Sequence, residues 1–168
     1  MCWAACDRLA RIASVLGQSE RAALWQTRAA EVRETILKRA RNDRRQAFVE
    51  SRDGSHLDAS VLLMAEVGFL PPQDPRFVST VQAMERTLCD GPFMRRYEAE
   101  DDFGLPVTTF NVCSFWRVDA LARIGRRDEA RDAKDDESLG EVLQNYAECL
   151  IKAGKLPQAL VAAKEARD

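Results

Sequence analysis

Apolar residues recur at every third or fourth position over most of the chain, and this helical period restricts the fold more than any other feature. The first apolar stripe consists of Cys2, Cys6, Leu9, Ile12, Ala13 and Leu16. Gly17 predicts the end of that helix, and Ser19 is the predicted cap of the next one. The second stripe consists of Trp25, Ala29, Val32 and Ile36. The first forty residues therefore predict a hairpin of two helices.

Helices and loops continue to alternate beyond this hairpin. Residues 41–56 lack the helical period, and the stretch 47–51 suits a short strand. Ser55, with Asp58 three residues later, predicts the start of a helix that is apolar on nearly all sides and therefore buried. Asp74 followed by Pro75 predicts the start of an outer helix. Its single apolar stripe is Phe77, Val81, Met84 and Leu88.

Residues 90–106 again lack the helical period. They contain an extended stretch, 93–97, and an acidic group made of Glu98, Glu100, Asp101 and Asp102. Residues 108–124 predict a second strongly apolar inner helix, which Gly125 ends, and the charged start of an outer helix follows. The sequence therefore predicts an all-α fold of inner and outer helices joined by long loops.

The C-terminal part of the sequence differs in character. Residues 132–137 contain no apolar residue except one alanine, so we expect a junction there. Residues 138–168 predict a compact helix-turn-helix with Gly154 between its helices, and this segment resembles a single tetratricopeptide unit. A single unit of that kind cannot bury its own apolar face, so we expect it to pack on another surface.

Composition excludes several classes of function. Charged residues make up 31% of the chain and the net charge is −2, which disfavours nucleic acid and membrane partners. Five scattered cysteines suit a reducing compartment, predict cytoplasmic localisation and are interpreted as buried apolar residues. The basic run 38–45 is interpreted as the end of a helix. No zinc signature or glycine-rich phosphate loop is found, so neither a metal nor a cofactor is expected.

Several stretches resemble glycoside hydrolase family 15, the branch that contains bacterial glucoamylases and trehalases. They lie in the family's order, near its spacing, over about residues 1–131: 1–8, 25–32, 57–60, 67–76, 96–97 and 110–116. The resemblance implies part of a six-hairpin (α/α) barrel, followed by the junction 132–137 and the hairpin 138–168. It also implies removal of terminal α-linked glucose with inversion of configuration.

The resemblance places both catalytic glutamates outside this chain. The acid belongs to a Gly-Ile-Trp-Glu segment before the position that matches Met1, and the base belongs to a loop after the position that matches Arg131. We therefore expect a truncated frame that is inactive alone. An incomplete barrel also exposes the apolar flanks of its inner helices, so we expect self-association.

A partial sugar subsite is the remaining expectation from the resemblance. Arg96, beside Tyr97, corresponds to an arginine that binds the terminal glucose, and its planar donors suit vicinal hydroxyls. Asp101 and Asp102 stand near the position of a hydroxyl-binding carboxylate. Val107 departs from the family, which often has glutamate there. The competing interpretation of this stretch is a solvated loop with exposed ion pairs.

Other interpretations remain open at this point. A helical-repeat module for protein–protein interaction is the main alternative, based on the tail. A small complete enzyme using the acidic group 98–102 is the third, and it requires two facing carboxylates with separated pKa values. His56 is interpreted as a loop or structural residue, and Asp58 as a helix-start residue. Trp3, Trp25 and Trp116 are interpreted as core residues.

Overall fold

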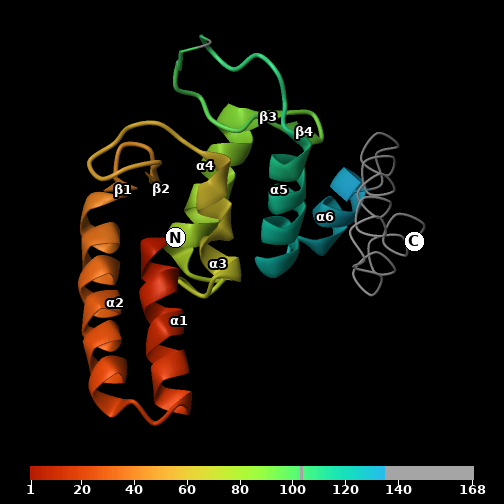
Figure 1. Cartoon of the computed structure of the whole chain (residues 1–168). Coiled ribbons are helices and arrows are strands. Elements are labelled where there is room, and N and C mark those ends of the chain that lie inside the picture. Colours follow the sequence, from red (N-terminus) through yellow and green to blue (C-terminus); the bar gives the residue numbers. More distant parts are fainter. Residues whose placement is uncertain (103, 135–168) are drawn as a thin grey trace.

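The computed structural model describes residues 1–102 and 104–134, so the predicted hairpin 138–168 lies outside the described residues. The described part is mainly helical, as predicted. The helices are α1 (Cys2–Val15), α2 (Ser19–Arg39), η1 (Ala59–Leu62), α3 (Leu63–Glu66), α4 (Pro75–Leu88), α5 (Asn111–Arg123) and α6 (Arg127–Lys134). Figure 1 shows them as successive pairs, α1 with α2, α3 with α4, and α5 with α6. Within the described ranges, no helix is long and apolar enough to cross a membrane.

The first hairpin packs through small side chains. Ala10 and Ala13 of α1 and Ala22 and Ala29 of α2 are buried. Gly17 has a positive φ of 69°, which confirms the predicted turn. Ser19 is not the cap, because the N-cap residue is Gln18 and no side chain caps the helix.

The apolar face predicted for α1 is only partly correct. Leu9, Ile12 and Leu16 are 40%, 54% and 64% exposed, although Ala13 is buried. Alanines face α2 and allow the two backbones to approach closely, so the larger apolar side chains of α1 are left uncovered. The stripe read from the sequence is therefore rotated relative to the face that the hairpin buries.

A two-stranded ribbon follows α2. Strand β1 (Arg41–Asn42) pairs antiparallel with β2 (Ala47–Phe48), in the register Arg41 with Phe48 and Asn42 with Ala47. The strand within 47–51 is confirmed, although it is shorter than expected. Only part of the basic run closes a helix, because α2 ends at Arg39 and the next residues form β1.

The buried middle of the fold begins at Asp58. Asp58 is the N-cap of η1, and its own carboxylate accepts a hydrogen bond from the Ser60 backbone N–H at 2.7 Å. The predicted cap at Ser55 is therefore wrong, whereas the helix-start interpretation of Asp58 is confirmed. The prediction that this helix is buried on nearly all sides is only partly confirmed. In the η1–α3 segment, Leu62 and Ala65 are buried, whereas Leu63 and Met64 are half-buried.

Helix α4 is the best-predicted element. The Asp74 carboxylate accepts a hydrogen bond from the Arg76 backbone N–H at 2.9 Å, and Pro75 occupies the first turn. The predicted stripe is fully buried, as shown by the exposures of Phe77, Val81, Met84 and Leu88, which are 0%, 1%, 0% and 0%. Thr80, on the same helix, accepts a hydrogen bond from the Phe48 backbone N–H at 3.0 Å, which fixes β2 against α4.

A second ribbon precedes α5 and sets its start. Strands β3 (Cys89–Asp90) and β4 (Phe93–Met94) pair antiparallel. The Phe110 backbone N–H donates to the Met94 carbonyl at 2.9 Å, and the Ser114 hydroxyl accepts from the Met94 N–H at 3.0 Å. Helix α5 begins at Asn111, three residues after the predicted Thr108, because Phe110 bonds to β4.

Glu85 joins three helices. From α4, its carboxylate lies 3.3 Å from Nη2 of Arg117 on α5 and 2.5 Å from Nη1 of Arg126, at the start of α6. The Glu85 and Arg117 side chains are 16% and 15% exposed. Charges this far from solvent require partners, so this cluster holds α4, α5 and the start of α6 against one another.

The cysteines occupy several environments. Cys113 is buried, Cys6 and Cys89 are half-buried, and Cys2 is exposed, so the interpretation of all five as core residues is wrong for Cys2. All four of these thiols are free. Cys149 lies outside the described residues.

Asp74 makes stability depend on acid pH. Hydrogen bonding to Arg76 lowers the pKa of this carboxyl to about 2, although burial opposes the shift. Its contribution is complete above the unfolded-state pKa near 4 and is lost as pH falls toward 2. Replacement by Asn keeps the cap but removes the charge. We expect the free energy of unfolding of wild type to fall by about 1 kcal/mol more than that of Asp74→Asn when the pH is lowered from about 4 to about 2. Urea unfolding at several pH values measures both. Equal losses would contradict this assignment.

Removal of the Glu85 carboxylate should destabilise the chain. Glu85→Ala leaves Arg117 and Arg126 without their shared partner, and we expect a loss of about 1–3 kcal/mol in the free energy of unfolding. The control is Glu129→Ala, which removes an exposed partner of Arg126 and should change the free energy of unfolding far less. Chemical denaturation measures both. A similar cost for the two variants would exclude the role given to Glu85.

Candidate functional site

Two segments that are distant in sequence form the floor of the candidate site. Residues 57–59, which lead into η1 and include its first residue, pair antiparallel with residues 96–98, which follow β4. Asp58 and Tyr97 form the bridge, the Ala59 N–H donates to the Arg96 carbonyl at 2.8 Å, and the Glu98 N–H donates to the Leu57 carbonyl at 3.3 Å. This backbone pairing places the predicted site residue Arg96 beside Asp58.

Arg96 is held by a carboxylate and an indole ring. Its Nε lies 3.3 Å from Oδ1 and 3.4 Å from Oδ2 of Asp58, and its guanidinium carbon lies 5.5 Å from the centre of the Trp116 ring. The Arg96 side chain is 37% exposed and that of Asp58 is 18% exposed. The guanidinium is therefore anchored through Nε on a side chain that remains partly accessible to solvent.

Cys113 lies next to this pair, on the buried side of α5. Burial raises the pKa of its thiol to about 11, while the positive charge of Arg96 opposes the shift. The thiol is therefore protonated at neutral pH, and it is unsuited to act as a nucleophile because thiolates are the reactive form. It also accepts a hydrogen bond from the Arg96 side chain, so it is a neighbour of the guanidinium.

Glu98 has a structural role. Its carboxylate lies 2.6 Å from Nη2 of Arg45 and accepts a hydrogen bond from the Leu57 backbone N–H at 2.9 Å. The side chain is 15% exposed. The loop that follows β1 is thus tied to the strand pairing beneath Arg96. This use of Glu98 opposes the hypothesis of a small enzyme based on the acidic group.

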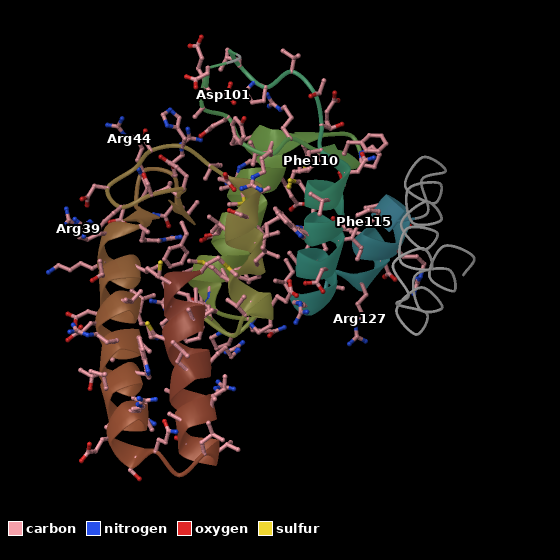
Figure 2. All side chains as sticks on the ribbon, viewed as in Figure 1. Arg39, Arg44, Asp101, Phe110, Phe115 and Arg127 are labelled. Atoms are coloured by element: carbon pink, nitrogen blue, oxygen red, sulfur yellow. The ribbon has the colours of Figure 1, made fainter. Side chains whose placement is uncertain are left out.

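The other predicted site residues lie on the loop that follows. The Tyr97 hydroxyl donates a hydrogen bond to the Asp101 carboxylate, and that bond raises the pKa of Tyr97. Asp101 also pairs through its backbone with Gly104, and Asp102 is exposed. Figure 2 shows Asp101 on the loop at the same end of the molecule as Arg44 and Phe110. The structure thus brings Tyr97 and Asp101 together next to Arg96, and it records no contact between Arg96 and Asp102.

Asp58, Cys113 and Trp116 are neighbours of Arg96 that sequence analysis did not assign to the site. Asp58 was assigned only a helix-start role, and Trp116 was assigned to the core although it is half-buried. One sequence signal was available for Trp116: it lies three positions after Cys113, so both side chains share a face of one helix. No local signal pairs Asp58 with Arg96.

The remaining candidates lie away from this cluster. Trp3 is buried in the core against Phe69, with ring centres 5.1 Å apart, as predicted, and Trp25 is half-buried. His56 is exposed in a loop, 3.8 Å from Glu50, which confirms the loop interpretation. In the part of the chain that the structure describes, no group of three or more metal-ligating side chains is found.

Comparison with known proteins identifies relatives along nearly the whole chain. The sequence profile described as Glycosyl hydrolases family 15 matches residues 1–161. That match crosses the predicted junction 132–137. A protein named trehalase from Mycobacterium tuberculosis is 38% identical over 134 residues, covering 78% of this chain and 20% of the relative. A protein named trehalase from Thermoplasma volcanium is 26% identical over 184 residues, covering 96% of this chain and 30% of the relative.

Solved structures share the fold. A wild-type glycosidase aligns with a TM-score of 0.58 at 22% identity, covering 65% of this chain and 29% of the glycosidase, and a variant in complex with glucose aligns equally well. The described helices therefore have the arrangement found in part of a glycosidase. This chain spans 20% to 30% of the length of the relatives given above. Because the family profile matches almost all of its residues, the chain belongs to glycosyl hydrolase family 15.

Proposed function

We propose that this chain supplies part of the glucose-binding surface of an inverting, exo-acting α-glucosidase of the trehalase or glucoamylase type. The observation that supports this function best is the state of Arg96, which is paired with Asp58 through Nε while its side chain is 37% exposed. A planar, partly exposed guanidinium suits adjacent sugar hydroxyls. The trehalase names of the relatives and the glucose complex of a structural neighbour agree with this ligand class.

The other site residues have complementary roles in this proposal. Carboxylates accept hydrogen bonds from sugar hydroxyls, so Asp101 and Asp102 are the proposed acceptors on the loop beside Tyr97. Trp116, under the guanidinium, supplies an apolar surface. These groups bind and orient a terminal glucose.

Bond cleavage requires residues that this chain lacks. Inversion uses one carboxylic acid on the leaving oxygen and one carboxylate that activates water, about 6.5–9.5 Å apart. The family resemblance places both glutamates outside residues 1–168, so the chain alone is proposed to be inactive. We assign it to the cytoplasm, because Cys2, Cys6, Cys89 and Cys113 are all free thiols.

A protein–protein interaction module remains the alternative function, and it rests only on the segment 138–168. The division into a partial barrel (1–131), a junction (132–137) and a hairpin (138–168) also stays a prediction. Helix α6 extends through Lys134, and Ala133 is 7% exposed, so the first residues of the expected junction continue the helix.

Substitution of Arg96 tests the sugar-binding proposal. Arg96→Gln removes the charged donor fork, so we expect the glucose dissociation constant to rise at least about tenfold, since hydrogen bonds to charged groups are among the strongest. Titration followed by NMR measures this constant. The control is Arg127→Gln, because Figure 2 shows Arg127 at the opposite end of the molecule from the loop that carries Asp101. Equal glucose binding by Arg96→Gln and wild type would refute the proposal.

A hydrolysis assay tests the proposed inactivity. The 168-residue chain should release no glucose from trehalose or maltose above the rate in buffer, because neither catalytic glutamate is present. Glucose release that depends on the chain, and that is lost in Arg96→Gln, would show instead that the acidic residues of this chain support catalysis.

We also propose that the chain self-associates through α1. Leu9, Ile12 and Leu16 form an uncovered apolar stripe, and Val15 beside it is 88% exposed. Contiguous exposed apolar side chains favour burial against a second copy. Charges at the centre of such a contact oppose association.

Sedimentation velocity tests this contact. We expect dimers or larger species for the wild-type chain, and a shift toward monomer for the double variant Ile12→Glu, Leu16→Glu. Gln26→Glu, at an exposed position of α2, is the matched control and should leave the distribution unchanged. A wild-type chain that sediments as a monomer at all concentrations would exclude the contact.

A further inference from the structure

We infer that Asp58 is a positioning residue that fixes Arg96 in its binding orientation before any ligand arrives. This inference rests on the proposed function, because it concerns the arginine that we assign to glucose. The helix-start role of Asp58 does not require Arg96, since the hydrogen bond to the Ser60 N–H satisfies that role alone. The second contact of the same carboxylate therefore needs its own explanation.

Asp58 holds the guanidinium through its inner nitrogen, Nε. Both carboxylate oxygens approach Nε, at 3.3 and 3.4 Å. Within residues 1–102 and 104–134, the hydrogen-bond partners of the Arg96 side chain are the Asp58 carboxylate, through Nε, and the Cys113 thiol. An arginine that served only an internal ion pair would use its terminal nitrogens in the two-point contact that guanidinium and carboxylate favour. Here the carboxylate pairs through Nε and the thiol is only a weak acceptor, so we infer that the terminal nitrogens keep donors for a ligand.

Asp58 is itself rigidly held. Its carboxylate is fixed by the Ser60 N–H at 2.7 Å, and its backbone pairs with that of Tyr97. The adjoining Ala59 N–H bonds to the carbonyl of Arg96 itself at 2.8 Å. The anchor and the arginine therefore share one backbone pairing, which fixes the separation of their backbones.

Arg96 is also confined on its other sides. The Trp116 ring lies under the guanidinium, and the thiol of Cys113 lies beside it. A long, flexible side chain is thus restricted by a carboxylate, a ring and a buried thiol, although it is still 37% exposed. Lysine has no Nε–H group of this geometry and no planar head, so it cannot use the same anchor.

Positioning of this kind should improve binding. An arginine that is already ordered loses less conformational entropy when a sugar binds. Asp58→Asn keeps the hydrogen-bond acceptor for the Ser60 N–H but removes the charge that holds Nε. We expect Asp58→Asn to raise the glucose dissociation constant about fivefold while η1 remains folded.

The fold offers a matched control. Asp74 is also an N-cap aspartate, accepts a hydrogen bond from a backbone N–H two residues later and pairs with an arginine, Arg76. Asp74→Asn therefore reproduces the loss of a charged cap elsewhere in the structure. It should leave glucose binding within about twofold of wild type.

A double-mutant cycle in the full 168-residue chain, with glucose as the probe, separates positioning from general stability. We expect Asp58→Asn to weaken binding about fivefold in wild type and to have little further effect in Arg96→Lys, because lysine lacks Nε. Equal effects of Asp58→Asn in both backgrounds, or no effect in wild type, would overturn the inference.

NMR of the arginine side chain gives a readout that needs no ligand. In the free chain, the Arg96 Nε–H should give a resolved resonance that exchanges slowly with water, and Asp58→Asn should broaden it or speed its exchange, whereas Asp74→Asn should not. If this NMR pattern is observed but neither the wild-type chain nor any variant binds glucose, the sugar-binding proposal fails and the contact between Asp58 and Arg96 stands. If glucose binds and Asp58→Asn leaves both the resonance and the affinity unchanged, the positioning inference fails alone.

Discussion

The buried stripe of α4 is the surface on which the rest of the described structure assembles. Phe77, Val81, Met84 and Leu88 are almost completely removed from water, and burial of such side chains is the main favourable term in folding. Strand β2 is held against this helix by Thr80, and Glu85 ties α5 and α6 to it. The ribbons that follow α2 and α4 emerge at the same end of the fold, as Figure 1 shows, and this places the candidate site there.

The site is built from acidic residues that each join an arginine to a backbone N–H group. Asp58 contacts Arg96 and the Ser60 N–H, and Glu98 contacts Arg45 and the Leu57 N–H. Carboxylates that are shielded from solvent are costly unless they are paired and hydrogen-bonded, and both of these are. This pattern converts irregular segments into a rigid support, which suits a binding surface that must present donors in a fixed direction. It also explains why Asp58 and Glu98, although they lie near the sugar-binding candidate Arg96, have structural roles.

The uncovered apolar surface of α1 can be compared with the larger proteins of glycosyl hydrolase family 15. In the described part of the chain, Ile12, Val15 and Leu16 have no partner helix, although they follow the spacing of a packing face. The helices have the arrangement found in part of a larger glycosidase, and the chain spans 20% to 30% of the length of its relatives. The α1 hairpin therefore has more apolar surface than its own two helices can bury. The same constraint underlies the proposed self-association.

Sequence alone determined the elements whose signals are local. The Asp74–Pro75 start of α4, its buried stripe, the turn at Gly17 and the all-α class all follow from spacing, caps and backbone preferences within a few residues. The resemblance also selected Arg96 and Tyr97 as neighbours at a site. Tertiary structure alone decided which face of α1 is buried, why α5 begins at Asn111, and which carboxylate holds Arg96. The physical reason is that these features depend on contacts between segments far apart in sequence. Asp58 and Arg96 are 38 positions apart, and only the pairing of their backbones brings them together.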